Sequence, residues 1–344
     1  MTPSALPRRT VLAWATALPA AGLGACTATP AGGPRASTGS MPAFDLQGHR
    51  GARGLAPENT LAAFERALEI GVSTLELDIA LTADGVPVVT HDPALNPAHT
   101  RDASGVFLRA PGPAVHQLTL AQLKTYDVGR LDPASKYGQQ FATQAPRDGE
   151  RIPTLRELFA FTQAAAAADL RFNIEAKTDP TAPASTAPVD AMVRAIVDEV
   201  KRARLMDRVT LQSFDWRAQA LAAPLAPGLS RAWLSSPRTL RDPRWTRGLD
   251  VQDFGGSVPR LVQAASADGH GPAIWSPAFG DLTAAQVREA QGLGLQVIPW
   301  TVNQPADLAR VMDLGVNGII TDYPDRLRAL MRERGLPLPR GLKN

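Results

Sequence analysis

The alternation of eight short apolar runs with amphipathic stretches constrains the fold of this chain more than any other feature. The apolar runs are predicted strands at residues 44–49, 74–80, 172–176, 209–214, 231–234, 273–276, 296–301 and 318–321. The clearest helical periodicity lies at 60–69, 155–167, 189–203, 284–292 and 306–314. Eight βα units of this kind predict a TIM (β/α)8 barrel. An open doubly wound sheet is the alternative, but no Gly-x-Gly-x-x-Gly follows a strand.

One segment interrupts this rhythm. Residues 93–150 hold a Pro- and Gly-rich stretch, one predicted helix near 119–126 and polar loops, which we interpret as an insertion after the second strand. The insertion either caps the mouth of the barrel or is decorative. Capping-box spacings support three helix starts, at Thr119 with Gln122, Thr154 with Glu157, and Thr283 with Gln286.

The N-terminus has the composition of an export signal. Arg8 and Arg9 precede an apolar stretch from residue 11 to 25 that is too short for a convincing membrane span. The sequence "LGAC" resembles the lipobox of bacterial lipoproteins, so we expect Cys26, the only cysteine, to carry a lipid. "PRRTVLA" also resembles a twin-arginine signal. These features predict an exported, periplasmic protein that is anchored to a membrane.

The chain is thus divided into a signal peptide (1–25), a flexible tether (26–42), a barrel (43–334) and a C-terminal tail (335–344). Its 36 basic and 33 acidic residues give a formal net charge of +3, and two of the basic residues lie in the signal. This balance argues against a broad nucleic-acid-binding surface. The sequence does not indicate an oligomeric state.

Polar side chains gather late in the predicted strands, where barrel enzymes carry their catalytic groups. Glu76 and Asp78 lie two residues apart and therefore share one face of a strand. Together with Glu175 they would repel one another in the interior unless a cation lay between them. Three carboxylates form an oxygen site suited to Mg²⁺ or Ca²⁺. Salt bridges with Arg50 and Lys177 are the alternative interpretation.

Two histidines follow extended runs close to this predicted metal site. His49 ends the first strand, and His91 follows the run "VVT". Because the unperturbed pKa of imidazole is near ~6.5, a neutral ring and a protonated ring can act as general base and general acid. The remaining histidines are expected to be ordinary loop residues, namely His99, His116 and His270.

Four further residues are predicted to bind the substrate. Arg50 and Lys177 would surround an anion such as a phosphodiester, whose oxygens gain charge during displacement. Gln212 lies late in the fourth predicted strand, and Trp300 lies late in the seventh. We expect Trp300 to pack against the carbon skeleton of the substrate.

Together, these residues resemble the glycerophosphodiester phosphodiesterase family. The similar stretches are "HRGARGLAPENT", "ELDIALTADGVPVVTHDPAL", "FNIEAK", "LQSFD", "PWTVN" and "GIITDYP", which occur in family order across roughly residues 44–325. The resemblance implies a TIM barrel with an insertion after the second strand. It implies hydrolysis of a glycerophosphodiester to sn-glycerol 3-phosphate and an alcohol, in which the glycerol 2-hydroxyl attacks phosphorus and water then opens a cyclic phosphate.

The resemblance also implies roles for individual residues. His49 and His91 would be the acid/base residues, and Arg50 and Lys177 would contact the phosphate. One divalent cation would be held by Glu76, Asp78 and Glu175. Glu58 and Asn59 of "PENT" are expected to support the site or cap the first helix. The insertion matches no family pattern closely, which leaves the preferred alcohol open.

Three other functions remain open from the sequence. A phospholipase D-like enzyme acting on lysolipids or sphingolipids would use the same site, and a membrane anchor would bring it close to lipids. A glycoside hydrolase on the same barrel would use Glu76 and Glu175 as its carboxylate pair. A non-catalytic lipoprotein that binds small ligands is the third possibility, although no candidate catalytic residue is missing.

Overall fold

The computed structural model describes residues 44–165, 167, 169–267, 271–280 and 282–342 of this chain. Its sheet contains eight parallel strands in the spatial order β8-β7-β6-β5-β4-β2-β1-β9, and a short strand β3 pairs antiparallel with β2. The strands are β1 (Asp45–Gly48), β2 (Thr74–Leu81), β3 (Pro87–Val89), β4 (Arg171–Ala176), β5 (Val209–Ser213), β6 (Ser230–Ser235), β7 (Ala273–Pro277), β8 (Gln296–Val297) and β9 (Gly318–Thr321).

Backbone hydrogen bonds join the two ends of this strand order. Asn317 N donates to Val297 O at 2.9 Å, and Ile320 N donates to Pro299 O at 3.0 Å. Because these bonds link β9 to β8 and its continuation, the parallel strands form a nearly closed barrel, and the predicted TIM barrel is confirmed. The strand predicted at 296–301 ends early at Val297. Pro299 is the physical reason, because it has no N–H to donate to a strand ladder.

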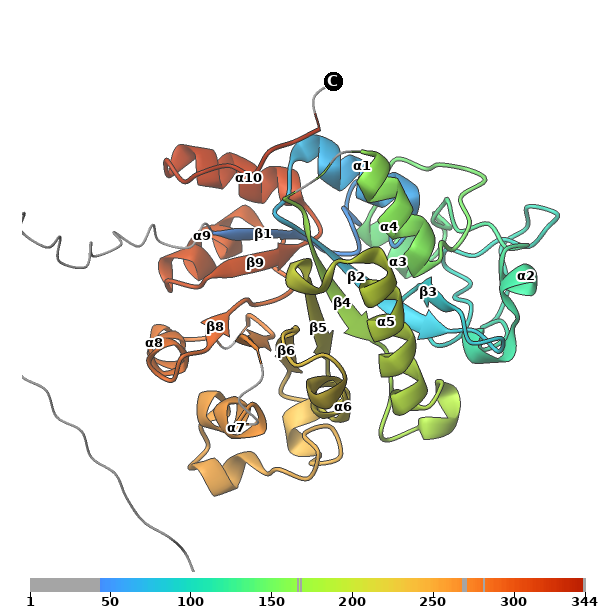
Figure 1. The fold of residues 1–344 in the computed structure, drawn as a ribbon. Coiled ribbons are helices and arrows are strands. Elements are labelled where there is room, and N and C mark those ends of the chain that lie inside the picture. The colour runs from blue at the N-terminus through green and yellow to red at the C-terminus, as the bar shows by residue number, and fades with distance from the viewer. Residues whose placement is uncertain (1–43, 166, 168, 268–270, 281, 343–344) are drawn as a thin grey trace, which may run out of the picture. The chain divides into compact units, whose positions relative to one another are not determined.

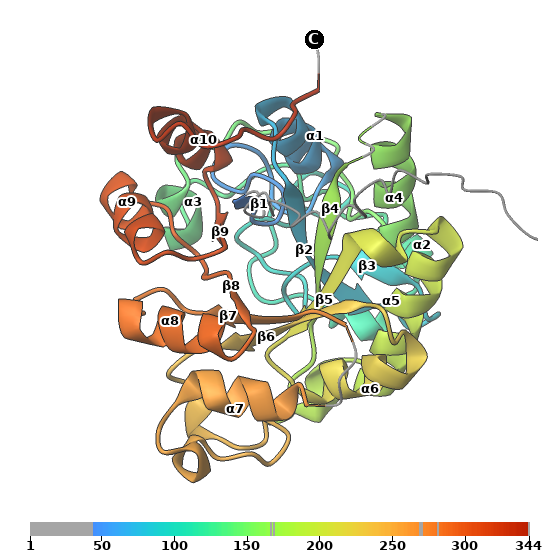
Figure 2. The same cartoon turned by 60° about the vertical axis from the view of Figure 1, so that its left-hand side comes forward.

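Helices surround the barrel strands (Figure 1). They are α1 (Leu61–Ile70), α2 (Leu120–Leu123), α3 (Lys136–Gln140), α4 (Leu155–Ala164), α5 (Val189–Ala203), α6 (Arg217–Leu225), α7 (Val258–Ala265), α8 (Ala284–Gly292), α9 (Pro305–Asp313) and α10 (Pro324–Glu333). All three predicted capping boxes are present, at the starts of α2, α4 and α8. Helices α7 to α10 follow one another along the side formed by β7, β8 and β9 (Figure 2).

Apolar side chains fill both faces of the strands. The large core cluster lies between the strands and the helices, and it includes fully buried Phe64, Leu75, Ile174 and Leu211. A small cluster of Ala232, Ile274, Ile298 and Ile320 comes from alternate strand positions of the opposite face and packs against Trp300. It forms an apolar layer beneath the carboxyl ends of the strands. Burying apolar side chains contributes about 1.5–3 kcal/mol each, so this packing fixes the strand ends in place.

The insertion at 93–150 is packed against the barrel. It contains α2, α3 and the 3-10 turn Val115–Gln117. A separate apolar cluster joins it to the β2–β3 hairpin through Val88, Val115, Leu123 and Ile152. The helix predicted near 119–126 is a single turn. Hydrogen bonds also tie the C-terminal tail to the barrel, since Leu342 N donates to Leu68 O at 2.9 Å.

Among the described residues, no helix is both long enough and apolar enough to cross a membrane.

Candidate active site

A cavity of about 170 Å³ opens at the carboxyl ends of the barrel strands. This is the face on which TIM barrels carry their active sites. Most of the residues predicted to form the site line it. The lining residues are His49, Arg50, Arg53, Glu76, His91, Glu175, Lys177, Gln212, Phe214, Leu234, Trp300, Thr301 and Ile320.

Three buried carboxylates meet at the base of this cavity. Asp78 and Glu175 are direct neighbours in the pairing of β2 with β4, and Glu76 lies two residues before Asp78 on β2. One oxygen from each of the three lies within 4.8 Å of the others. Burial raises the pKa of Glu175 to about 7, and burial together with the Asp78 charge raises that of Glu76 well above its usual value. The protein alone therefore does not neutralise this cluster.

The charges and hydrogen bonds around these three carboxylates show whether a divalent cation fits between them. Arg50 binds Glu58 at 2.6 Å and Asp78 at 3.1 Å, and Lys177 Nζ lies 2.8 Å from Glu175. These ion pairs agree in part with the alternative interpretation, in which salt bridges with Arg50 and Lys177 balance the carboxylates. However, these two cations face four carboxylates. Asp78 Oδ1 is buried without a hydrogen-bond partner among the described residues. The three oxygens and the excess negative charge therefore suit a divalent cation.

An unusual backbone conformation brings Arg50 to the cluster. Arg50 has φ = 49° and Gly51 has φ = 84°, so the chain turns sharply after β1. In this turn Arg50 N donates to Glu76 Oε2 at 2.9 Å, while Gln212 Nε2 donates to Glu76 Oε1 at 2.7 Å. Asn59 Nδ2 donates to Asp78 at 2.9 Å, whereas Thr60 caps α1. The strained backbone of Arg50 thus directs its N–H to the Glu76 carboxylate and holds that carboxylate in place.

His49 is held by a carboxylate that follows the last strand. Its Nδ1 lies 2.7 Å from Asp322 Oδ1, and its Nε2 lies 3.8 Å from Glu76 Oε2. Arg53 donates two hydrogen bonds to Asp322, and Asn303 donates a third. Because a carboxylate can only accept, His49 Nδ1 carries a proton and Nε2 faces the carboxylates. Burial and the nearby Arg53 charge lower the pKa of His49 to about 4.

His91 is held in a similar way at the edge of the insertion. Its Nδ1 lies 2.8 Å from Asp92 Oδ1, and its side chain is 32% exposed, against 11% for His49. Asn96 Nδ2 donates to Asp92 Oδ2 at 2.7 Å, and His99 Nε2 lies 3.5 Å from the same oxygen. His99, expected to be an ordinary loop residue, therefore lies behind His91. Burial and the charges of Lys177 and Arg50 lower the pKa of His91.

The insertion also contacts the site through Tyr137, on the side of Glu58 and Arg53. Tyr137 of α3 donates a hydrogen bond to Glu58, the carboxylate that pairs with Arg50. Its hydroxyl accepts from Arg53 Nη1 at 3.1 Å, and the Arg53 guanidinium lies 4.8 Å from the ring centroid of Phe141. The insertion therefore contacts Arg53 directly and Arg50 through Glu58.

One wall of the cavity is apolar. Trp300 packs edge to face on Phe214 with ring centroids 5.3 Å apart, and its indole N–H donates to Ser276 O at 3.0 Å. Leu234 and Ile320 complete this wall. The indole N–H is satisfied by the protein, so the ring offers the cavity an apolar surface.

The structure brings together every barrel residue predicted for the site: His49, Arg50, Glu76, Asp78, His91, Glu175, Lys177, Gln212 and Trp300. Cys26 and His270 lie outside the described residues. The site also contains five residues that the sequence patterns did not predict, namely Asp322, Arg53, Asn303, Asp92 and Tyr137. Asp322 directly follows the last strand, so the strand-end rule that found the other carboxylates could have found it.

Comparison with known proteins agrees with this geometry. The family model described as the glycerophosphoryl diester phosphodiesterase family matches residues 49–326. A glycerophosphodiester phosphodiesterase of Caldanaerobacter subterraneus subsp. tengcongensis is 30% identical, with 83% of this chain and 97% of the relative covered.

Solved structures of glycerophosphodiester phosphodiesterases also resemble this chain. A Silicibacter pomeroyi DSS-3 structure described as a glycerophosphoryl diester phosphodiesterase has 38% identity and a TM-score of 0.77, covering 87% of this chain and 96% of its own. An Oleispira antarctica phosphodiesterase in complex with the product sn-glycerol-3-phosphate shares the fold, with 23% identity, a TM-score of 0.60 and coverage of 84% and 97%. Because the family match extends from the end of the first strand into α10, this chain belongs to the glycerophosphoryl diester phosphodiesterase family.

Proposed function

We propose that this protein hydrolyses glycerophosphodiesters to sn-glycerol 3-phosphate and an alcohol, with His49 and His91 as the acid/base pair. The observation that carries the proposal is the convergence of both imidazoles and three buried carboxylates on one cavity in a member of this family. The product named for the Oleispira antarctica structure, sn-glycerol-3-phosphate, supports the same substrate class.

The two histidines differ in ways that suit different roles. Buried His49 has a lowered pKa, and Asp322 keeps its Nε2 free of a proton, so it takes the proton from the attacking hydroxyl. His91 is more exposed and lies beside the insertion, at the side from which a leaving alcohol can reach solvent. Once protonated, it gives its proton to the departing alkoxide. Asp92 holds the His91 ring in the orientation needed for this transfer.

Arg50 and Lys177 provide fixed positive charge beside the same cavity. Both side chains already pair with carboxylates, so they are held in place before substrate binds. They would therefore stabilise the charge on the phosphoryl oxygens without reorganisation. The family depends on a divalent cation, which we place at Glu76, Asp78 and Glu175 as Mg²⁺ or Ca²⁺. Such an ion supplies Lewis-acid stabilisation of the developing charge.

We further propose that the protein is exported and anchored in the periplasm through lipidated Cys26. The support is the order of Arg8 and Arg9, the apolar stretch and "LGAC" in the sequence. The test is mass spectrometry of the membrane fraction from cells that express the full chain, with Cys26→Ser as the control. A lipid on the N-terminal peptide, lost in the variant, supports the anchor, and an unmodified Cys26 contradicts it.

The activity is tested with glycerophosphocholine and glycerophosphoethanolamine as substrates. We expect release of glycerol 3-phosphate from at least one of them, loss of turnover in EDTA, and recovery when Mg²⁺ or Ca²⁺ is added back. Activity that EDTA leaves unchanged would contradict the metal assignment. Turnover of a glycoside in place of both diesters would support the glycosidase alternative instead.

A further inference from the structure

A chain of polar contacts leads from the leaving-group side of the active site into the insertion. His91 Nδ1 lies 2.8 Å from Asp92 Oδ1, and the other oxygen of the same carboxylate, Oδ2, faces His99. His99 ends a turn of the insertion, which Asp132 N joins by donating to Ala98 O at 2.8 Å. The proposed function uses His91 and Asp92 but gives His99 no role.

The imidazole of His99 is placed to hold Asp92. Its side chain is 12% exposed, and its Nε2 lies 3.5 Å from Asp92 Oδ2. This nitrogen is buried and makes no hydrogen bond to any other described residue. Because a carboxylate can only accept, His99 Nε2 carries the proton of this contact. A distance of 3.5 Å is long, as catalytic contacts often are before substrate binds.

The surroundings of His99 favour a protonated ring. Burial alone would disfavour the charge, but Asp92 and Glu58 outweigh burial and raise the pKa of His99 above its ordinary value. The charge of Arg50 acts in the opposite direction. Tyr137 of α3 lies beside the ring, with centroids 6.2 Å apart. A cationic His99 is therefore placed between two carboxylates that support the active site.

His99 adds a second donor to one oxygen of Asp92. Asn96 Nδ2 already donates to Asp92 Oδ2 at 2.7 Å, and Asn96 Oδ1 accepts from Ala98 N at 2.9 Å in the same loop. A charged donor strengthens the hold on this oxygen, because hydrogen bonds between charged groups contribute more than neutral ones. Asn96 and His99 thus hold one oxygen of the carboxylate, and His91 takes the other.

We propose that His99 is a positioning residue for departure of the alcohol: it holds Asp92, and through Asp92 it orients the imidazole of His91. The inference rests on the proposed function. In that step the bond between phosphorus and the alcohol oxygen breaks, its electron pair goes to that oxygen, and His91 gives the oxygen a proton. A ring turned away from the oxygen cannot make this transfer. The effect of His99 should therefore appear only when the leaving group needs a proton.

The test compares two substrates that differ in their leaving group. Glycerophosphocholine releases an alkoxide that needs a proton, whereas the p-nitrophenyl ester of glycerol 3-phosphate releases a phenolate that leaves without one. We expect His99→Leu to lower kcat for glycerophosphocholine about ten-fold, the effect of one hydrogen bond to a charged group, with little change in KM. Turnover of the p-nitrophenyl ester should stay within about two-fold of wild type, which also shows that the variant is folded.

Two further variants separate positioning from a general effect on the fold. His99→Gln keeps an N–H that can donate to Asp92, so it should restore kcat for glycerophosphocholine to within about three-fold of wild type. In a His91→Ala background, His99→Leu should cause no further loss, because both changes remove the same proton transfer.

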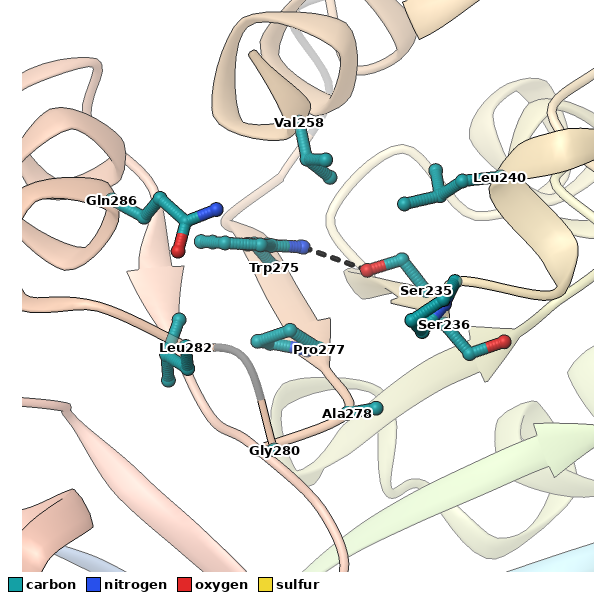
Figure 3. A pocket seen from close by; sticks show the side chains of 11 residues that line it. Ser235, Ser236, Leu240, Val258, Trp275, Pro277, Ala278, Gly280, Leu282 and Gln286 are labelled. Atoms are coloured by element: carbon teal, nitrogen blue, oxygen red, sulfur yellow. Dashed lines mark hydrogen bonds between the residues drawn. The ribbon is translucent and has the colours of Figure 1, made fainter. Parts of the chain in front are cut away.

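Ser235→Ala is the matched control for loss of a buried hydrogen bond at the mouth of the barrel. Ser235 Oγ accepts from Trp275 Nε1 at 2.9 Å, beside a second cavity of about 300 Å³ at the ends of β6 and β7 (Figure 3). Neither residue belongs to the lining of the catalytic cavity. We expect the ratio of kcat for the two esters to remain that of the wild type.

The outcomes separate the inference from the proposed function. Equal losses on both esters in His99→Leu, or no loss on either, overturn the inference and leave the proposed function intact. No recovery in His99→Gln, a further loss in the His91→Ala background, or the same selective loss in Ser235→Ala also overturns it. A wild-type protein that hydrolyses neither ester refutes the proposed function itself.

Discussion

Without the cation, the free energy of unfolding of this protein should fall as the pH rises. The ionisation of Glu175 should account for this fall. In the metal-free fold, burial raises the pKa of Glu175 to about 7 from an ordinary value near 4.5. A group whose pKa is higher in the folded state stabilises the fold below its unfolded pKa. That stabilisation is lost as the pH rises through the folded value.

The size of the effect follows from this shift. At 1.36 kcal/mol per pKa unit, the shift corresponds to a loss of about 3 kcal/mol of unfolding free energy between pH 4.5 and pH 8. For a domain of this size, 1 kcal/mol changes the Tm by about 2 °C, so the expected fall is roughly 6 °C. Mg²⁺ or Ca²⁺ at one hundred times its Kd should return about 2.7 kcal/mol at pH 8.

The assay is thermal and urea unfolding in EDTA from pH 4.5 to 8, for the wild type and for Glu175→Gln. The variant cannot titrate at this position, so the difference between the two pH profiles reports Glu175 together with its effect on the neighbouring Glu76. Glu65→Gln, at a half-buried carboxylate of α1 that pairs with Arg147, controls for the loss of one acidic group. Parallel profiles for the wild type and Glu175→Gln, or no effect of either cation at pH 8, would refute the reasoning.

Three further predictions concern the residues around the catalytic cavity. His49→Ala and His91→Ala should each lower kcat at least ~10²-fold for glycerophosphocholine, and near-normal turnover removes that residue from the mechanism. Asp322→Asn should lower kcat by ~10²- to 10⁴-fold with little change in KM, because an amide can stabilise the wrong His49 tautomer; a change confined to KM would contradict this role. Tyr137→Phe should destabilise the fold by about 1.5–3 kcal/mol, since it removes a hydrogen bond to charged Glu58, and an unchanged urea midpoint would show that the contact contributes nothing.

Local patterns were sufficient to predict the barrel and its carboxylates. Strand alternation and strand-end position depend on neighbouring residues, so Glu76, Asp78 and Glu175 could be placed on one face before any packing was known. The same patterns predicted strand ends less well. Pro299 interrupts the regular ladder of the seventh predicted strand, although the chain continues alongside β7 beyond that point.

Contacts made across the chain could not be predicted in the same way. Tyr137 reaches Glu58 only because the insertion folds back over the barrel, and the insertion has no periodic pattern that specifies its path. The pairing of Arg53 with Asp322 joins the two ends of the fold. Such contacts depend on how distant loops pack, which a single sequence does not encode in any short-range signal.

The bond between His49 and Asp322 joins residues 273 positions apart in the chain. A chain whose synthesis stops before β9 would still contain both imidazoles and all three carboxylates, but it would lack the carboxylate that holds His49 Nδ1. The ring of His49 is therefore held in this way only after the final strand has docked beside the first. Orientation of this imidazole and completion of the polypeptide are coupled in one side-chain contact.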